Sequence, residues 1–260
     1  MGRGFGIIST TRPEVIEQVA AEAERLGYSS FWANDIPGGD GLAALAAAAG
    51  ATTSIRLASG VLGVRRHAPE GIARGVERLR LPVERLTIGL GTGGAERPLR
   101  AVRAGVEGLK RLLDVPVIIA ATGPKMRVLA GEVADGALFN WPSPMTAAAA
   151  RDIVLDAAQR AGRPQPSVSA YVRCALMPQA EAAMEAEIDQ YARHGPYADQ
   201  LAAAGLTARD AVVRGADAAG LQSGIAAFEP ILDEVVVRAI TADEEPTSLL
   251  ELLRACAPPG

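Results

Sequence analysis

The sequence predicts a single (β/α)8 barrel over residues 1–260. Short apolar runs alternate with longer stretches of helical periodicity, and eight such pairs follow one another along the chain. The short runs are apolar throughout, as expected for parallel strands that helices cover on the outside. The residues that follow the runs are polar or glycine, as expected at the end of a barrel that carries a site. An open, doubly wound parallel sheet is the alternative architecture.

Each element has its own signal. The first strand, FGIIS, is followed by Pro13 in a first helical turn, by an apolar stripe and by Gly27 at a C′ position. The fourth strand ends in a glycine-rich turn, and the fifth is followed by a proline that begins a helix. The expected strands are 5–9, 29–33, 55–60, 86–90, 117–121, 137–140, 167–176 and 234–240. The expected helices are 13–26, 40–50, 68–79, 98–113, 124–134 and 146–161, two or three over 180–232, and one over 247–255.

No strong linker divides the chain. The best candidate, GRPQP at 162–166, reads as a loop between a helix and a strand. A length of 260 residues suits one barrel, which typically needs about 250. The segment between the fourth and fifth strands is short.

Composition excludes several classes of partner. The net charge is −4 with acids and bases interspersed, so no basic stripe is available for nucleic acid. The longest apolar runs, such as 42–49, fall short of the roughly 20 residues that span a membrane. No secretion signal opens the sequence, so we expect a cytoplasmic protein. Cys174 and Cys256 are interpreted as isolated packing residues, and with two histidines no metal site is expected.

The turn after the fourth strand is rich in glycine. GLGTGG at 89–94 matches G-x-G-x-x-G, and Asp114 lies 20 residues beyond Gly94. A dinucleotide site needs that acid after the next strand, whereas Asp114 precedes it, so NAD binding is not expected. The turn is either a tight connection or a place where the amides of Gly91, Thr92 and Gly93 approach an anion.

The turn after the fifth strand carries the strongest functional signal. Thr122 and Gly123 follow the strand, Pro124 begins a helix, and Lys125 and Met126 lie in its first turn. A lysine at a helix N-terminus opposes the helix dipole, and a bound anion removes that cost. The turn therefore predicts a phosphate site, against the alternative of an exposed lysine in solvent.

Other strand ends supply further candidates. Gly60-Val61 suggests a bulge or a strained peptide, and Asp35 is either a site residue or the start of an Asx turn. Trp141, after Asn140, either lines a planar ligand or caps the barrel. His67 is interpreted as a helix cap or a surface residue. No triad of nucleophile, base and orienting residue is evident.

Four segments, 21–35, 44–62, 86–93 and 116–144, resemble the luciferase-like monooxygenase superfamily and, within it, the coenzyme F420-dependent oxidoreductase branch. The last segment, PVIIAATGPKMRVLAGEVADGALFNWPSP, is the most specific. The resemblance implies a dimeric barrel that binds a flavin or deazaflavin at the strand ends. It implies a cis peptide at Gly60-Val61, cofactor phosphate at the turn of Thr122 to Lys125 with help from 91–93, and Asp35 near the ring and substrate.

The sequence departs from that pattern at two positions near the expected ring. Ile36 stands where many F420 enzymes have histidine, and Gly94 stands where many have glutamate. The group that exchanges a proton with the substrate is therefore not identified by resemblance.

The resemblance implies an F420-dependent oxidoreductase that passes a hydride between the deazaflavin and a small-molecule substrate. Three alternatives remain open: an FMN-dependent monooxygenase of the same fold, a non-catalytic relative with a degraded pocket, and a phosphate-binding isomerase or aldolase.

Overall fold

A computed structural model describes residues 1–193 and 195–259, with the backbone alone for 195–197. Its centre is a closed ring of eight parallel strands, because β10 pairs with β1 on one side and with β8 on the other. The strands of the ring are β1 (Gly2–Ile7), β2 (Ser30–Ala33), β3 (Arg56–Ser59), β5 (Leu86–Gly91), β6 (Val117–Ala120), β7 (Gly136–Asn140), β8 (Ser167–Leu176) and β10 (Glu234–Ile240). The predicted barrel is confirmed, and the open sheet is excluded.

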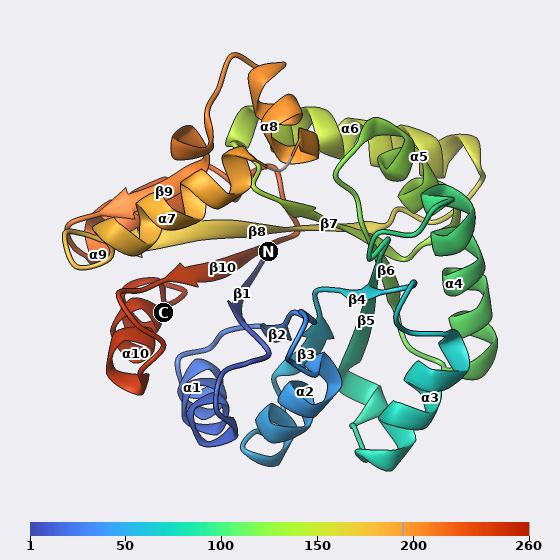
Figure 1. The fold of residues 1–260 in the computed structure, drawn as a ribbon, viewed down its shortest axis with the longest axis horizontal. Coiled ribbons are helices and arrows are strands. Elements are labelled where there is room, and N and C mark those ends of the chain that lie inside the picture. Colours follow the sequence, from blue (N-terminus) through green and yellow to red (C-terminus); the bar gives the residue numbers. More distant parts are fainter. Residues whose placement is uncertain (194, 260) are drawn as a thin grey trace.

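Helices surround the strands on the outside (Figure 1). They are α1 (Pro13–Arg25), α2 (Gly41–Gly50), α3 (Pro69–Arg78), α4 (Pro98–Leu112), α5 (Pro124–Val133), α6 (Pro144–Arg160), α9 (Ala218–Ala226) and α10 (Pro246–Ala255). Six of them begin with proline, which suits a first helical position because its missing N–H has no partner there in any case. The fourth and fifth strands of the ring are joined by α4 and two short loops, as the sequence predicts.

The region between β8 and β10 differs from the prediction, which contained helices alone. Two helices, α7 (Glu181–Ala192) and α8 (Gly195–Ala202), are followed by the strand β9 (Val212–Gly215). β9 pairs with the last four residues of β8, where β7 has already ended. A second short strand, β4 (Leu62–Gly63), pairs with β5. Both strands are too short to give a periodic signal in the sequence.

The barrel interior is a packed core beneath its mouth. Six side chains, one each from β2, β3, β6, β7, β8 and β10, form this cluster: Trp32, Ala58, Ile118, Leu138, Tyr171 and Val236. The indole of Trp32 and the ring of Tyr171 meet edge to face at 5.9 Å. This layer is the floor on which any site at the strand ends rests.

Both cysteines are fully buried, as expected of packing residues. They are not isolated in space, since the neighbouring Cys256 thiol, together with burial, raises the pKa of the Cys174 thiol. Among the described residues, no three His, Cys, Asp or Glu side chains are grouped so as to hold a metal ion. Within the same residues, every helix is too short or too polar to cross a bilayer.

Glu24, near the end of α1, holds the loop that leads into β3. Its carboxylate accepts hydrogen bonds from the backbone N–H groups of Thr53, Ser54 and Ile55 at 2.6–3.1 Å. Burial acts to raise the pKa of this carboxyl, but the three backbone donors outweigh it and lower the pKa to about 2.

The substitution Glu24→Gln is expected to lower the free energy of unfolding at pH 7 by about 1–2 kcal/mol. Because the pKa of Glu24 is lower in the folded protein than its ordinary 4.5, the wild-type advantage is full above that pH. It is lost as the pH falls towards 2. Urea unfolding at pH 7, 4 and 3 measures this, with Glu17→Gln on the exposed face of the same helix as control. A wild-type advantage that does not change with pH would contradict the assignment.

Candidate functional site

The mouth of the barrel has two unlike sides. Since side chains alternate along a strand, every second residue points into the barrel. At the ends of β3, β5 and β6 the inward residues are small, namely Gly60, Gly91 and Ala120. At β7, β8, β10 and β2 they carry hydrogen-bond donors: Asn140, Arg173, Arg238 and Asn34. A bare shelf therefore faces a polar wall.

A cavity of about 130 Å³ lies between the shelf and the wall. Its lining includes Gly60 and Val61 on one side and Tyr171, Arg173 and Arg238 on the other. It adjoins a second cavity of about 440 Å³ beneath α7, and the two share lining residues at Asn34, Tyr191 and Arg238. The two cavities together form the candidate site.

The shelf is bare because side chains do not fit there. A Cβ atom at Gly60 would lie 2.2 Å from the Tyr171 hydroxyl, and one at Gly91 would lie 2.6 Å from a methyl group of Val61. The peptide bond between Gly60 and Val61 is cis, which confirms the geometry implied by the resemblance. Thr92 and Gly93 continue beyond the shelf, where the backbone of Gly93 lies against Gly63.

Helix α7 covers the polar wall and is tied to it through Arg173. The guanidinium of Arg173 donates to Glu187 at 3.1 Å and to the Tyr191 hydroxyl at 3.0 Å, both on α7. It also contacts the side-chain oxygen of Asn140 and lies 4.8 Å from the centre of the Trp141 ring. Arg173 is 3% exposed, and the carboxylate of Glu187 neutralises its charge inside the protein.

Trp141 caps the barrel and lies outside the lining of the 130 Å³ cavity. Its side chain is 1% exposed and packs with Ala180, Met184 and Leu201 under α7 and α8. Its φ of +57° is a left-handed conformation that a bulky residue rarely adopts. Of the two sequence interpretations, the structure supports the cap.

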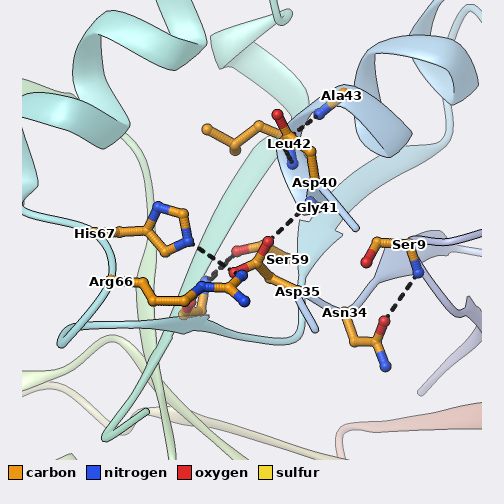
Figure 2. Close-up of polar contacts among 11 residues, drawn as sticks. Ser9, Asn34, Asp35, Asp40, Gly41, Leu42, Ala43, Ser59, Arg66 and His67 are labelled. Carbon is orange, nitrogen blue, oxygen red and sulfur yellow. Dashed lines mark hydrogen bonds and ion pairs between the residues drawn. The ribbon is translucent and has the colours of Figure 1, made fainter. Parts of the chain in front are cut away.

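Asp35 is a clamp between two loops (Figure 2). Its carboxylate accepts a hydrogen bond from the backbone N–H of Gly41 at 3.1 Å, contacts His67 Nε2 at 2.7 Å and pairs with Arg66. The side chain is 1% exposed and lines neither cavity of the mouth, although its neighbours Asn34 and Ile36 do. The described contacts therefore give Asp35 a structural use. They also correct the interpretation of His67, which is a partner of Asp35 and not a simple cap.

The turn of Thr122 to Lys125 lies at the same end of the barrel but outside the mouth cavities. Lys125 lines a groove of about 440 Å³ between α4 and α5, together with Arg100 and Arg103. Space around Gly123 is open, whereas the side chain of Met126 is 8% exposed and belongs to the hydrophobic core. A buried neighbour, Arg127, braces the turn by donating to the carbonyl of Thr122 at 2.7 Å.

The structure thus brings Gly60, Val61, Gly91 and Asn140 together at the mouth of the barrel. Lys125 and Asp35 lie outside the lining of the two mouth cavities. It adds three residues that the sequence analysis missed, Tyr171, Arg173 and Arg238. A signal for the two arginines was present, because each interrupts an apolar run within its strand, in YVRCAL and in VVVRAI. A charge inside a buried parallel strand requires an explanation in the site or in an ion pair.

The comparisons with known proteins agree with the fold. The model of a family described as luciferase-like monooxygenase matches residues 3–107 and 96–257, two overlapping segments that cover nearly the whole chain. The chain belongs to the luciferase-like monooxygenase family.

Solved structures share the family fold at low identity. A coenzyme F420-dependent tetrahydromethanopterin reductase from Methanopyrus kandleri is 19% identical, with a TM-score of 0.75 over 96% of this chain and 97% of that one. An F420-dependent secondary alcohol dehydrogenase in complex with an F420–acetone adduct is 17% identical, with a TM-score of 0.76 over 98% of each chain. The oxygenating constituent of 3,6-diketocamphane monooxygenase from Pseudomonas putida, in complex with FMN, is 16% identical, with a TM-score of 0.72 over 99% and 98%.

Removal of the clamp by Asp35→Ala is expected to lower the free energy of unfolding by about 2–3 kcal/mol, because three donors lose a buried charged acceptor. A double-mutant cycle with His67→Ala should show a coupling of about 1 kcal/mol. Asp40→Ala is the matched control: Asp40 caps α2 by accepting from Leu42 and Ala43, so its effect should add to that of His67→Ala. Additivity between Asp35 and His67 would refute the clamp.

Proposed function

We propose that this protein is an oxidoreductase that binds coenzyme F420 and transfers a hydride between the deazaflavin and a small organic substrate. The observation that carries the proposal is the shelf at the barrel mouth, where Gly60, Val61 and Ala120 line a cavity opposite the polar wall and Val61 covers Gly91. A flat ring needs a surface without projecting side chains on one face and room for a second reactant on the other. The shelf and the wall supply these two conditions.

The size and cover of the site suit this chemistry. Cavities of about 130 and 440 Å³ adjoin, and ligand pockets typically measure roughly 300–1,000 Å³. The bound deazaflavin would supply the hydride chemistry, and the chain supplies position and electrostatics. In this arrangement the ring would lie against Gly60, Val61 and the turn of Gly91, Thr92 and Gly93. Helix α7 would exclude water from the mouth.

The phosphate end of the cofactor would lie towards α5. Thr122, Gly123 and Pro124 form an open turn at a helix N-terminus, and Lys125, Arg100 and Arg103 line the groove beside it. Arg103 is paired with Glu132, which leaves Lys125 and Arg100 as the cations without an ion pair in the described part of this groove. Backbone amides and a nearby ammonium group favour a phosphate.

Equilibrium dialysis with F420 and with FMN tests the cofactor. We expect retention of F420 with a dissociation constant in the micromolar range or below, and weaker retention of FMN. Tighter binding of FMN, with oxygen consumption in the presence of reduced FMN, would instead support the monooxygenase alternative that the FMN complex of the diketocamphane enzyme suggests. Retention of neither cofactor would overturn the proposal, and binding without turnover over a broad substrate panel would indicate a non-catalytic relative.

The substitution Lys125→Ala is expected to weaken F420 binding by roughly 1–3 kcal/mol, because it removes a charge-assisted contact to phosphate. Lys110→Ala is the control, since Lys110 is the only other lysine of the sequence and pairs with Asp135 at the opposite end of α4. Dialysis of both variants against F420 makes the comparison. An unchanged affinity for the Lys125 variant would assign this lysine to solvent.

A further inference from the structure

The polar wall of the mouth contains a buried donor with no acceptor. The Tyr171 side chain is 5% exposed and lines the 130 Å³ cavity, and its hydroxyl has no hydrogen-bond partner among the described residues. Burial raises the pKa of this phenol, so at neutral pH the group is protonated and carries a proton to donate. Buried hydroxyls in folded proteins are nearly always paired. An acceptor from outside the chain would satisfy this one.

Arg238 presents a second donor to the same space. Arg238 lies on β10, which pairs with β8, the strand that carries Tyr171. It is partly buried and lines both cavities of the mouth. Its guanidinium donates a long hydrogen bond, 3.4 Å, to the carbonyl of Gly6, and no carboxylate in the described chain lies within ion-pair distance. Arg173 differs, because Glu187 neutralises it. Glu187 acts on Arg238 as well, but from beyond ion-pair distance, so among the described residues this positive charge of the wall has no counter-ion in contact.

The two asparagines of the wall also present donors. The side-chain oxygen of Asn34 accepts the backbone N–H of Ser9 at 3.0 Å (Figure 2), and the oxygen of Asn140 accepts from Arg173. These bonds use the oxygen of each amide, so each amide retains its NH₂ group for another partner. The cavity is therefore lined by donors that are available to a ligand, on Tyr171, Arg238, Asn34 and Asn140. No carboxylate side chain lines the 130 Å³ cavity within the described residues.

We propose that this cavity is an anion site that receives a carboxylate group of the substrate, held by the guanidinium of Arg238 and the hydroxyl of Tyr171. A carboxylate matches the wall in charge and in hydrogen bonding, because it is an acceptor at both oxygens. A volume of about 130 Å³ is below that of a whole ligand pocket, so the cavity takes one group and the rest of the molecule extends into the larger cavity.

The position of the anion site defines a substrate class. The anion site lies beside Gly60 and Val61 in the small cavity, so a carboxylate held there places the adjacent carbons of the substrate where the small cavity meets the larger one. Substrates are then small organic acids whose reacting carbon lies near the carboxylate. The assignment to a substrate rests on the proposed function, whereas the anion site rests on the wall alone.

Isothermal titration of the apoprotein with propionate tests the site, with propionamide as the uncharged analogue of the same shape. We expect millimolar binding of propionate and binding of propionamide at least tenfold weaker. Arg238→Gln should weaken propionate binding at least tenfold, and Tyr171→Phe at least threefold. Arg214→Gln, at an exposed arginine of β9, is the matched control and should leave binding unchanged. Equal binding of the two probes, or propionate binding that is unaffected in Arg238→Gln, would overturn the proposal.

The anion site remains testable even if the Arg238→Gln variant does not fold. Tyr171→Phe removes a hydroxyl that has no hydrogen-bond partner in the described part of the chain, so this variant should melt no lower than the wild type and remains measurable if Arg238→Gln does not fold. A lower melting temperature for Tyr171→Phe would show that the hydroxyl is already satisfied, which also contradicts the proposal.

Dialysis of the same variants against F420 and FMN separates the two proposals. Propionate binding that depends on Arg238 in a protein that binds neither cofactor retains the anion site and rejects the oxidoreductase. Loss of cofactor binding in Arg238→Gln with unchanged propionate binding assigns the arginine to the cofactor and rejects the anion site.

Discussion

Closure of the sheet by β10 decides which side chains meet at the mouth. Because β10 pairs with β1 and with β8, all eight strands point the same way around one axis, and their ends form a ring. Strand alternation then directs every second residue of each strand into the barrel, so that the last inward residue of each strand lies at the mouth. The small residues of β3, β5 and β6 are adjacent in this ring, and so are the polar residues of β7, β8 and β10. An open sheet would place the shelf and the wall on a flat edge with nothing between them.

Much of the fold follows from local sequence signals. The eight strands of the ring are apolar runs buried on both faces, and six helices begin at proline, so both can be recognised without tertiary information. β9 could not, because four residues that pair at the edge of β8 have no period and their strand character comes from the partner. The short segment β4 was missed for the same reason.

The site was predictable where it depends on backbone and not where it depends on long side chains. Gly60 and Val61 were singled out because glycine at a strand end indicates an unusual peptide, and Gly91 because the amides of a glycine-rich turn can approach an anion. Lys125 was expected to face the site, but the direction of its side chain depends on packing between α4 and α5. The clamp of Asp35 joins loops about 30 residues apart, and no local pattern reports such a pairing.

The polar groups of the chain separate into two kinds. Those of Asp35 and Glu24 are fully satisfied by neighbouring loops, and their removal affects stability. Those of Tyr171 and Arg238 are short of partners among the described residues, which costs folding free energy. A protein tolerates such a deficit where a ligand completes the network.

The excursion that carries α7 and α8 departs from β8 and comes back to the same strand through β9. Its two ends are joined directly, since the N–H of Met177 donates to the carbonyl of Gly215 at 2.8 Å. The roof is therefore an insertion anchored on one strand, and Glu187 and Tyr191 tie it further to the ring through Arg173. A change of length or sequence that keeps these contacts would reshape the chamber above the shelf and leave the eight-strand ring as it is.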